Sequence, residues 1–363
     1  MKVCFDATPL LSRRTGIGRY TEHLMNAIAG LPEHPELIAT AFTWRGLAAL
    51  DSAVPPGVTV SAKQMPARLL QACWQRTEWP KAESIAGRFD LFHATNFVLP
   101  PTRARGVVTI HDLSYLHHRN TVDATSQRLR ELVPKSLARA EIVCVTTQHL
   151  AGLIAVEYGV ESDRIAITPL GVDDQWLQTA PLTAERRREL GLPERYLLFV
   201  STIEPRKNVA RLLQAYRRMP SDTPPLVIVG AQGWGDALDM KDLDDGRILL
   251  PGYLELPALR ELVSGAALLA TPSIDEGFGL PAMEALACGT AVVVSDIPVF
   301  REVLAEQATY CDPYSVDSIA EALSATLRDG GPTSAQSRRD YAAARTWRRC
   351  AAATLTAYAA ALT

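Results

Sequence analysis

Short apolar segments alternate with amphipathic ones along almost the whole chain. Several of the apolar segments, such as LLFVS at 197–201, LVIVG at 226–230 and AVVVS at 291–295, lack the polar alternation of a half-exposed strand. Strands buried on both faces of a parallel sheet have this composition, and the helical periodicity between them indicates crossover helices. We therefore predict an α/β protein whose parallel sheets are covered by helices.

The predicted strands share this apolar character and are separated by turn residues or helical stretches. In chain order they are Lys2–Ala7, Ile38–Thr43, Thr59–Ala62, Leu91–His93, Val107–Ile110, Ile142–Thr146, Tyr196–Thr202, Leu226–Gly230, Ile248–Leu250, Ala267–Thr271 and Ala291–Ser295. Helical periodicity is clearest at Tyr20–Gly30, Ser126–Ala140, Val209–Met219, Leu256–Gly265 and Pro281–Cys288.

The length of 363 residues suits two domains, each large enough to bury its own core. Periodicity breaks between Thr168 and Thr183, where Pro, Gly and Asp cluster. We expect Rossmann-like, doubly wound domains over residues 1–172 and 173–344, facing each other across a cleft at the carboxyl ends of their strands. Residues 345–363 are predicted to form one Ala-rich helix that can return to the first domain. The side chains available for packing in it are Trp347, Leu355, Tyr358 and Leu362.

Composition narrows the class and the compartment. A net charge of −3 argues against a general electrostatic grip on nucleic acid. The six cysteines form no CxxC pair, so we expect buried, reduced thiols. No segment approaches the roughly 18 apolar residues of a spanning helix, and the start of the chain lacks the apolar region of a signal peptide. We expect a soluble, cytoplasmic protein.

Cations are in slight excess over carboxylates in residues 1–170, whereas carboxylates are in excess in the rest of the chain. Such a bias would favour peripheral contact with anionic lipid at the inner face of the cytoplasmic membrane. An ordinary solvated surface explains the same bias equally simply. The cations that produce it are Arg13, Arg14, Arg19, Arg103, Arg105, Arg128, Arg130, Lys135 and Arg139.

The strongest local signal is the glycine-containing segment that follows the strand ending at Thr271. Its loop, Glu276-Gly277-Phe278-Gly279-Leu280, leads into a helix with Pro281 at the first helical position. Glycines allow close approach of a ligand, and the unpaired amides of a helix start attract an anion, most simply a diphosphate. Glu284 would then accept hydrogen bonds from vicinal hydroxyls. If Glu284 only balanced the helix dipole, the glycine loop and Glu276 would have no explanation.

The pattern E-G-F-G-L-P-x-x-E-A-x-A-x-G resembles the signature of retaining glycosyltransferases of family 4, which have the GT-B fold of two facing Rossmann-like domains. The resemblance extends over nearly the whole chain, and its closest variants are bacterial mannosyl- and rhamnosyltransferases of O-antigen or exopolysaccharide synthesis. The other matching segments, in the expected order, are residues 6–20, 89–96, 109–113, 164–173, 201–208, 229–236 and 249–266.

The resemblance implies roles for charged residues of the second domain. Arg206 and Lys207 would stabilise the departing diphosphate, which needs positive charge. Ser201 stands where many members have another cation, and this departure places more of the task on Arg206 and Lys207. Glu284 would bind the ribose hydroxyls, and Glu276 would hold hydroxyls of the donor sugar.

Further residues are implicated in the same way. Gly16 and Gly18 would lie on a loop that approaches the phosphates, and His111, after its strand, would lie near the transferred sugar or the acceptor. Tyr253 belongs to the segment that flanks the nucleotide base. The implied donor-binding set is Gly16, Gly18, Ser201, Arg206, Lys207, Tyr253, Gly277, Phe278, Gly279, Leu280 and Glu284.

No residue is suited to covalent catalysis, so the resemblance implies retention by front-face attack, with the leaving phosphate accepting the proton. Nor does a carboxylate pair stand ready for a metal, because Asp173-Asp174 and Asp244-Asp245 are turn-like surface pairs. We therefore expect a metal-independent enzyme without a cofactor.

The function expected is transfer of a hexose, mannose before rhamnose, from a nucleotide-sugar donor, with a GDP-sugar favoured. The acceptor would be a saccharide, lipid-linked in bacterial surface polysaccharide synthesis. Two alternatives stay open: a nucleotide-sugar epimerase on the same fold, and a non-catalytic nucleotide-sugar-binding subunit. An NAD-dependent dehydrogenase is disfavoured, because GIGRY at 16–20 follows too long a loop and lacks a third glycine.

Overall fold

The computed structural model describes residues 1–11, 16–44, 46–117, 127–180, 182–231, 233 and 246–363. The chain forms two compact units. One comprises most of residues 1–171 together with Trp347–Thr363, and the other comprises Val172–Thr346 in its described parts. Both are parallel sheets with helices, which confirms the predicted α/β class.

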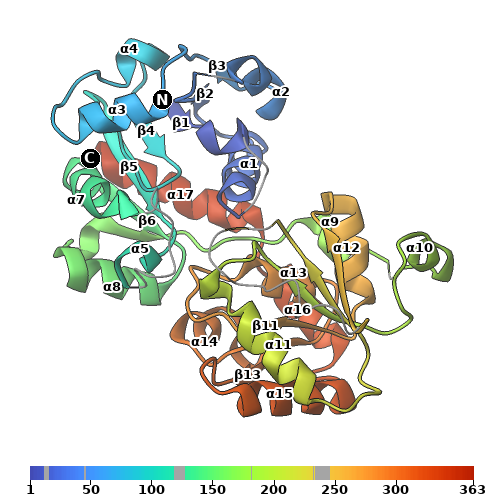
Figure 1. The fold of residues 1–363 in the computed structure, drawn as a ribbon. Helices are drawn as coiled ribbons and strands as arrows, with labels where there is room; N and C mark the ends of the chain where they lie inside the picture. Colours follow the sequence, from blue (N-terminus) through green and yellow to red (C-terminus); the bar gives the residue numbers. More distant parts are fainter. Residues whose placement is uncertain (12–15, 45, 118–126, 181, 232, 234–245) are drawn as a thin grey trace. The chain divides into compact units, whose positions relative to one another are not determined.

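The first unit is built on a seven-stranded parallel sheet with strand order β3-β2-β1-β4-β5-β6-β7 (Figure 1). Its strands are β1 (Lys2–Asp6), β2 (Glu36–Thr40), β3 (Thr59–Val60), β4 (Leu91–Ala94), β5 (Arg105–Ile110), β6 (Ile142–Val145) and β7 (Ile165–Ile167). Its helices are α1 (Gly16–Ala29), α2 (Leu50–Ala53), α3 (Ala67–Trp74), α4 (Glu83–Ala86), α5 (Ser114–His117), α7 (Leu129–Arg139), α8 (Gln148–Tyr158) and α17 (Trp347–Leu362). The central strands β4 and β6 are buried at every position, as their uninterrupted apolar sequences require.

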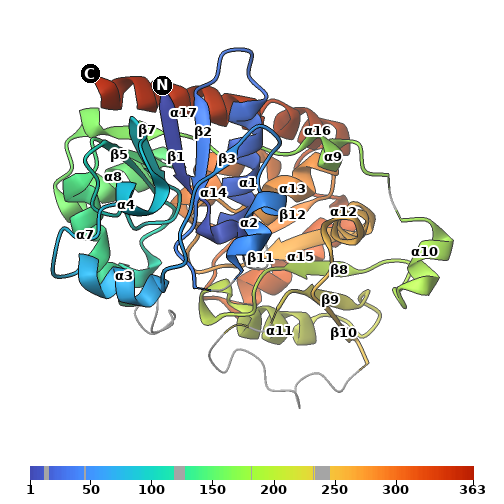
Figure 2. The same cartoon turned by 90° about the horizontal axis from the view of Figure 1, so that it is seen from above.

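The C-terminal helix α17 completes the first unit, although it is the last element of the chain. It packs beside α1 and against β5, β6 and β7 (Figures 1 and 2). Its buried face includes Trp347 and Tyr358, whereas Leu362 is exposed, so the prediction that Leu362 packs is wrong. The two places where the chain passes between units are adjacent, because Val172 pairs with Thr346 in a parallel bridge.

The second unit is built on a six-stranded parallel sheet with strand order β10-β9-β8-β11-β12-β13. Its strands are β8 (Leu197–Val200), β9 (Leu226–Val229), β10 (Ile248–Gly252), β11 (Leu268–Thr271), β12 (Val292–Ser295) and β13 (Thr309–Cys311). Its helices are α9 (Asp174–Leu177), α10 (Ala184–Glu189), α11 (Val209–Arg218), α12 (Leu256–Gly265), α13 (Leu280–Ala287), α14 (Pro298–Leu304), α15 (Val316–Asp329) and α16 (Ala335–Ala343). Its core contains Leu197, Phe199, Leu212 and Leu226.

The sequence prediction missed one strand in each sheet. Both missed strands, β7 and β13, are three residues long and lie at a sheet edge. Edge strands bury only part of their surface, so β7 carries no fully buried residue and gives no long apolar run. Helix α7 lies within the predicted helix Ser126–Ala140, whose first residue is outside the described part of the chain. Pro281 occupies the second rather than the first position of α13.

Buried thiols account for five of the six cysteines, and Cys73 is half-buried. Burial raises the pKa of Cys144, Cys288, Cys311 and Cys350 to about 12, so these thiols stay protonated at neutral pH. No helix among the described residues is long and apolar enough to cross a membrane.

Candidate active site

Two loops meet at the carboxyl edge of the second sheet, one after β8 and one after β11. The loop after β8 forms a single 3-10 turn, Pro205–Lys207, and ends at Asn208 in the left-handed conformation, with φ of 60°. The buried Asn208 amide donates hydrogen bonds to the carbonyl oxygens of Pro272, at 2.8 Å, and Pro313, at 2.7 Å. The amide of Ile274 donates to the carbonyl of Arg206 at 2.9 Å. Asn208 therefore ties the two loops together, a role that its place in the motif alone did not reveal.

The loops bring four charged side chains into contact. Lys207 Nζ lies 2.8 Å from both carboxylate oxygens of Glu276. Arg206 donates to the Glu204 carboxylate and to the Asp275 carbonyl, each at 2.9 Å, and its Nη1 lies 3.7 Å from Glu276 Oε2. The side chains of Arg206, Lys207, Glu204 and Glu276 are all less than 15% exposed. The structure thus assembles a balanced cluster of two cations and two carboxylates.

Glu276 is ionised in this cluster. Burial alone would raise the pKa of its carboxyl, but the Lys207 and Arg206 cations and hydrogen bonds from Lys207 and Ser273 lower that pKa below its usual value. Ser273 Oγ donates to Glu276 Oε1 at 2.8 Å, so it helps to fix the carboxylate. Sequence reasoning named Glu204 only as part of the motif around Arg206 and Lys207, without its ion pair, and it missed Ser273.

The turn before α13 depends on Gly279. Gly279 has φ of 85° and caps α13, and a Cβ there would collide with the Phe300 ring. Glu284 lies one turn into this helix and is 4% exposed. The helix start, with Gly277, Phe278 and Leu280, therefore adjoins the loop that carries Glu276, as the motif spacing requires. Whether these residues bind a donor remains a prediction.

Two more predicted donor-site residues follow strands of the same sheet. Ser201 comes directly after β8, and its amide donates to the Val229 carbonyl of β9 at 3.1 Å. A Cβ at Gly230 would overlap the carbonyl oxygen of Ser201, so a glycine is needed for this close approach. Tyr253 follows β10, two strands from β8 in the sheet order, and is partly exposed.

In the first unit, His111 follows β5 and is buried. Its Nε2 lies 2.8 Å from the carbonyl oxygen of Thr95, which can only accept, so Nε2 carries the proton and Nδ1 is the acceptor atom of the ring. Burial lowers the pKa of His111, so the ring is neutral at pH 7. The Tyr20 ring of α1 packs edge-on against it at 4.8 Å between centroids.

A second histidine, which sequence reasoning did not single out, lies behind His111. His93 Nδ1 lies 2.6 Å from the Tyr358 hydroxyl of α17, and its Nε2 lies 2.8 Å from Thr109 Oγ1. The Tyr20 hydroxyl bonds to the same Thr109 oxygen at 2.8 Å. Burial lowers the pKa of His93 to about 3. This network fixes α1 and α17 on the strand that precedes His111.

Gly16 and Gly18 are not on a loop, which corrects the prediction. Gly16 is the first residue of α1, and Gly18 is buried within its first turn. A Cβ at Gly16 would meet no atom within 4 Å. The expected glycine loop is therefore a helix start with open space beside it. Residues 12–15, which precede this helix, lie outside the described part of the chain.

The described residues contain no group of three or more His, Cys, Asp and Glu side chains that could hold a metal. Asp173 caps α9 by accepting from the Gln175 amide at 2.7 Å, and Asp174 is exposed in its first turn. The pair Asp244-Asp245 lies outside the described residues, and so do 232 and 234–236 of the loop 229–236. Metal independence therefore remains a prediction.

Two family profiles together match most of the chain. Residues 14–176 match the profile described as "Glycosyltransferase Family 4", and residues 183–345 match "Glycosyl transferases group 1". The chain is a family-4 glycosyltransferase. The resemblance seen in the EGFGLP segment and in residues 201–208 is thereby confirmed, and so is the expectation of a transferase enzyme.

Individual relatives agree with this assignment. The chain is 29% identical to the O-antigen chain mannosyltransferase B of Escherichia coli, over 99% of both chains. It is 30% identical to the O-antigen chain mannosyltransferase RfbU of Salmonella typhimurium, over 62% of both. Among solved structures, Anabaena Alr3699/HepE in complex with UDP and glucose superposes with a TM-score of 0.73 at 18% identity, covering 98% of this chain and 99% of that one. This last likeness concerns the fold alone.

Proposed function

We propose that the glycosyltransferase moves a mannosyl residue from a GDP-sugar to a saccharide acceptor, with retention of anomeric configuration, in the synthesis of a bacterial surface polysaccharide. The single observation that carries this proposal is the Lys207–Glu276 pair, buried beside the start of α13. The names of the relatives supply the choice of mannose and of the polysaccharide, with rhamnose as the next candidate sugar.

The pair suits a donor that carries both an anion and a polyol. The Lys207 ammonium has three N–H donors, and two of them are used by the two oxygens of Glu276. Glu276 thus orients Lys207, and the third donor can bind a phosphate oxygen. Glu276 keeps further lone pairs for sugar hydroxyls. Arg206, held by Glu204, adds a second fixed cation for the charge that develops on the leaving diphosphate.

In the proposed reaction the acceptor hydroxyl attacks the anomeric carbon on the face that the diphosphate leaves. The new C–O bond forms as the bond to the phosphate oxygen breaks, and the departing phosphate takes the hydroxyl proton. Arg206 and Lys207 stabilise the negative charge on the nucleoside diphosphate. Neutral His111 accepts a hydrogen bond from a hydroxyl through Nδ1 and orients it, without taking a full proton.

The donor test is calorimetric titration of GDP, UDP and dTDP with EDTA present, on the wild type and Glu276→Gln. We expect selective binding of GDP in both proteins, because Glu276 faces the sugar, and about a hundredfold lower turnover in Glu276→Gln. Tighter binding of UDP or dTDP would replace the GDP assignment. Binding only after magnesium is added would refute metal independence.

The reaction test follows GDP-mannose by NMR with a soluble mannoside acceptor and without it. An α-linked product from the α-configured donor supports retention, and an inverted product contradicts it. Conversion of the sugar without acceptor would instead identify an epimerase. Tight nucleotide binding without turnover of GDP-mannose or a rhamnose donor would favour the non-catalytic subunit.

A further inference from the structure

Trp79 projects from a loop that is otherwise firmly held. Its side chain is 71% exposed, whereas Trp74, five residues earlier, is buried and donates from Nε1 to the Pro80 carbonyl at 2.9 Å. Thr77 Oγ1 donates to the Trp79 carbonyl at 2.9 Å and accepts from the Trp79 amide. Hydrogen bonds therefore hold the backbone that carries this exposed indole.

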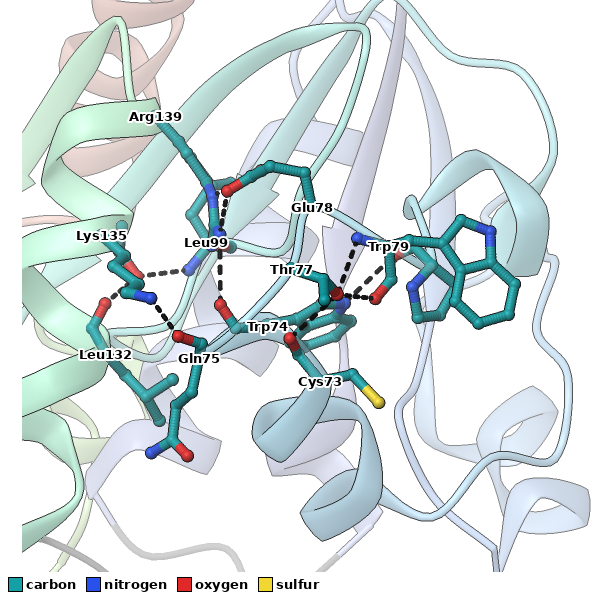
Figure 3. Close-up of polar contacts among 12 residues, drawn as sticks. Cys73, Trp74, Gln75, Thr77, Glu78, Trp79, Leu99, Leu132, Lys135 and Arg139 are labelled. Atoms are coloured by element: carbon teal, nitrogen blue, oxygen red, sulfur yellow. Dashed lines mark hydrogen bonds and ion pairs between the residues drawn. The ribbon is translucent and has the colours of Figure 1, made fainter.

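Helix α7 fixes the same loop from the other side (Figure 3). Arg139 holds the Glu78 carboxylate at 2.6 Å and donates to the carbonyls of Trp74 and Leu99. Lys135 Nζ donates to the Gln75 carbonyl. In Figure 3 the Trp79 indole points away from these contacts. Two half-buried cationic side chains thus support a loop whose aromatic ring has no core to enter.

Trp79 borders a hollow of about 830 Å³ on the surface of the first unit, called here the Trp79 hollow. Four cations line it against two carboxylates, Glu83 and Asp90. Lys2 of this set is paired with Glu36, but Lys81, Arg88 and Arg103 make no side-chain hydrogen bond or ion pair with any described residue. The complete lining is Lys2, Trp79, Lys81, Glu83, Ser84, Gly87, Arg88, Phe89, Asp90, Arg103 and Ala104.

Both carboxylates of the hollow are engaged with the backbone. Glu83 Oε1 accepts from the Thr102 hydroxyl and from the Arg103 and Ala104 amides, and these bonds lower the Glu83 pKa although burial opposes them. Asp90 accepts from the Lys2 amide at 2.7 Å. The carboxylates thus order the walls but keep their charge, and four cations against two carboxylates leave the lining with a positive net charge.

The structure also relocates the basic surface expected from the sequence. Arg130, Lys135 and Arg139 donate to backbone carbonyls within the unit, so they do not form a free cationic face. Arg13 and Arg14 lie outside the described residues. Of the cations named from the sequence, Arg103 lines the Trp79 hollow, and the other unpaired cations there, Lys81 and Arg88, were not named.

We propose that the Trp79 hollow docks the enzyme on an anionic phospholipid surface. Indole rings prefer the headgroup level of a bilayer, and exposed cations are drawn to anionic leaflets, so a fixed Trp beside three unpaired cations matches such a surface. Lys2, Asp90 and Arg103 flank the amino ends of β1, β4 and β5, and His111 follows the carboxyl end of β5. Docking by this edge leaves the His111 edge uncovered. The proposal rests on the proposed function and adds the surface of the enzyme that would face a membrane carrying a lipid-linked acceptor. Vesicle binding tests it without a sugar donor.

The test is sedimentation of the full chain with vesicles of phosphatidylcholine alone, or of phosphatidylcholine mixed equally with phosphatidylglycerol. We expect binding to the anionic vesicles only, weakening as salt is raised. Trp79→Ala, and separately Lys81→Glu with Arg103→Glu, should each lower the partition coefficient about tenfold. The matched controls are Trp44→Ala, which removes a Trp that is 59% exposed outside the hollow, and Arg188→Glu with Arg195→Glu on the second unit.

Equal losses in control and hollow variants would overturn the proposal, as would equal binding to neutral vesicles or none to anionic ones. Saturation of the hollow by soluble glycerol phosphate, with no vesicle binding, would assign it to a free anion instead. All substituted residues are at least partly exposed, and unchanged melting temperatures show that the variants fold. Transfer to a soluble acceptor is measured in parallel, so a failure of the proposed reaction is distinguished from a failure of docking.

Discussion

The two sheets place opposite chemistry at their carboxyl edges. In the first unit two histidines, His93 and His111, are neutral buried rings whose pKa values burial lowers, and they bond to hydroxyl and carbonyl groups. In the second unit Lys207 and Glu276 form an ion pair, held together at 2.8 Å. The same kind of strand end therefore carries buried neutral histidines in one unit and a buried ion pair in the other.

The difference shows how burial selects the chemistry of a site. A buried histidine is neutral where burial outweighs the effect of a nearby carboxylate, such as that of Asp112 on His111, whereas a buried carboxylate beside two cations stays charged. Substitutions that remove charge should consequently damage the second unit most, and changes of pH should affect the first.

Removing both cations of the charged edge is expected to have the largest effect. If the diphosphate leaves beside these side chains, Arg206→Ala with Lys207→Ala removes the positive charge that it faces. The double variant also leaves the buried Glu276 carboxylate with Ser273 but without a cation. We expect kcat/KM to fall by about a thousandfold, or roughly 4 kcal/mol. Steady-state kinetics measures this, with Arg217→Ala and Arg218→Ala on α11 as the matched basic pair. A double variant within a few-fold of wild type would place the diphosphate elsewhere.

The helix starts of the two edges should differ in their tolerance of a methyl group. Gly279→Ala meets the Phe300 ring at a positive φ and should lower the free energy of unfolding by about 3 kcal/mol. Gly16→Ala enters open space at the start of α1 and should change it by less than about 0.5 kcal/mol. Urea unfolding of both variants makes the comparison, and similar losses would contradict it.

The buried histidines of the first unit should make the free energy of unfolding sensitive to acid. His93 has a pKa of about 3 when folded, against 6.5 for the free side chain, so the unfolded chain binds the extra proton between these values. The contribution of neutral His93 to the free energy of unfolding is therefore complete above pH 6.5. Below that pH it falls by about 1.4 kcal/mol per pH unit, so about 2 kcal/mol is lost at pH 5. Asp6, with its pKa raised to about 6, acts in the opposite direction between 3.8 and 6.

Comparison with His93→Gln isolates this effect, because Asp6 is present in both proteins. We expect the stability gap between wild type and variant to close by about 2 kcal/mol between pH 6.5 and pH 5. Urea unfolding at both pH values measures it. If stability fell equally with acid in the two proteins, His93 would take up a proton as readily in the folded as in the unfolded chain.

The smallest effect is expected at Glu284. If its carboxylate binds ribose hydroxyls, Glu284→Ala should weaken nucleoside diphosphate binding about tenfold, or roughly 1.4 kcal/mol, with kcat less affected. Calorimetry measures the affinity, and Glu302→Ala on the exposed face of α14 is the control. Unchanged affinity would show that Glu284 does not bind the ribose and that its role is structural.

The sheets and the glycine turn could be predicted because their signals are local. Buried central strands such as β4 and β12 appear as apolar runs, and the turn at Gly279 needs a residue that accepts positive φ. Edge strands such as β7 give no such run. A helix start was misplaced where the helix begins before its periodic segment, as α1 does at Gly16.

The contacts that build the sites could not be predicted, because they join distant positions. Lys207 and Glu276 are 69 residues apart, and His93 and Tyr358 are 265 apart. Charge counting failed for a related reason. It treated Lys135 and Arg139 as surface cations, whereas the fold uses them to hold the Trp79 loop.

The length of β5 sets a reach. Arg105 begins this strand near the Trp79 hollow and Ile110 ends it just before His111, a span of six residues or roughly 20 Å. An enzyme resting on lipid by the amino edge of this sheet would work at about that height above the headgroups. Its acceptor would then be recognised by the far end of a glycan long enough to bridge the gap. An early intermediate with one or two sugars on its lipid would be too short, so the chain would act as an elongating rather than an initiating transferase.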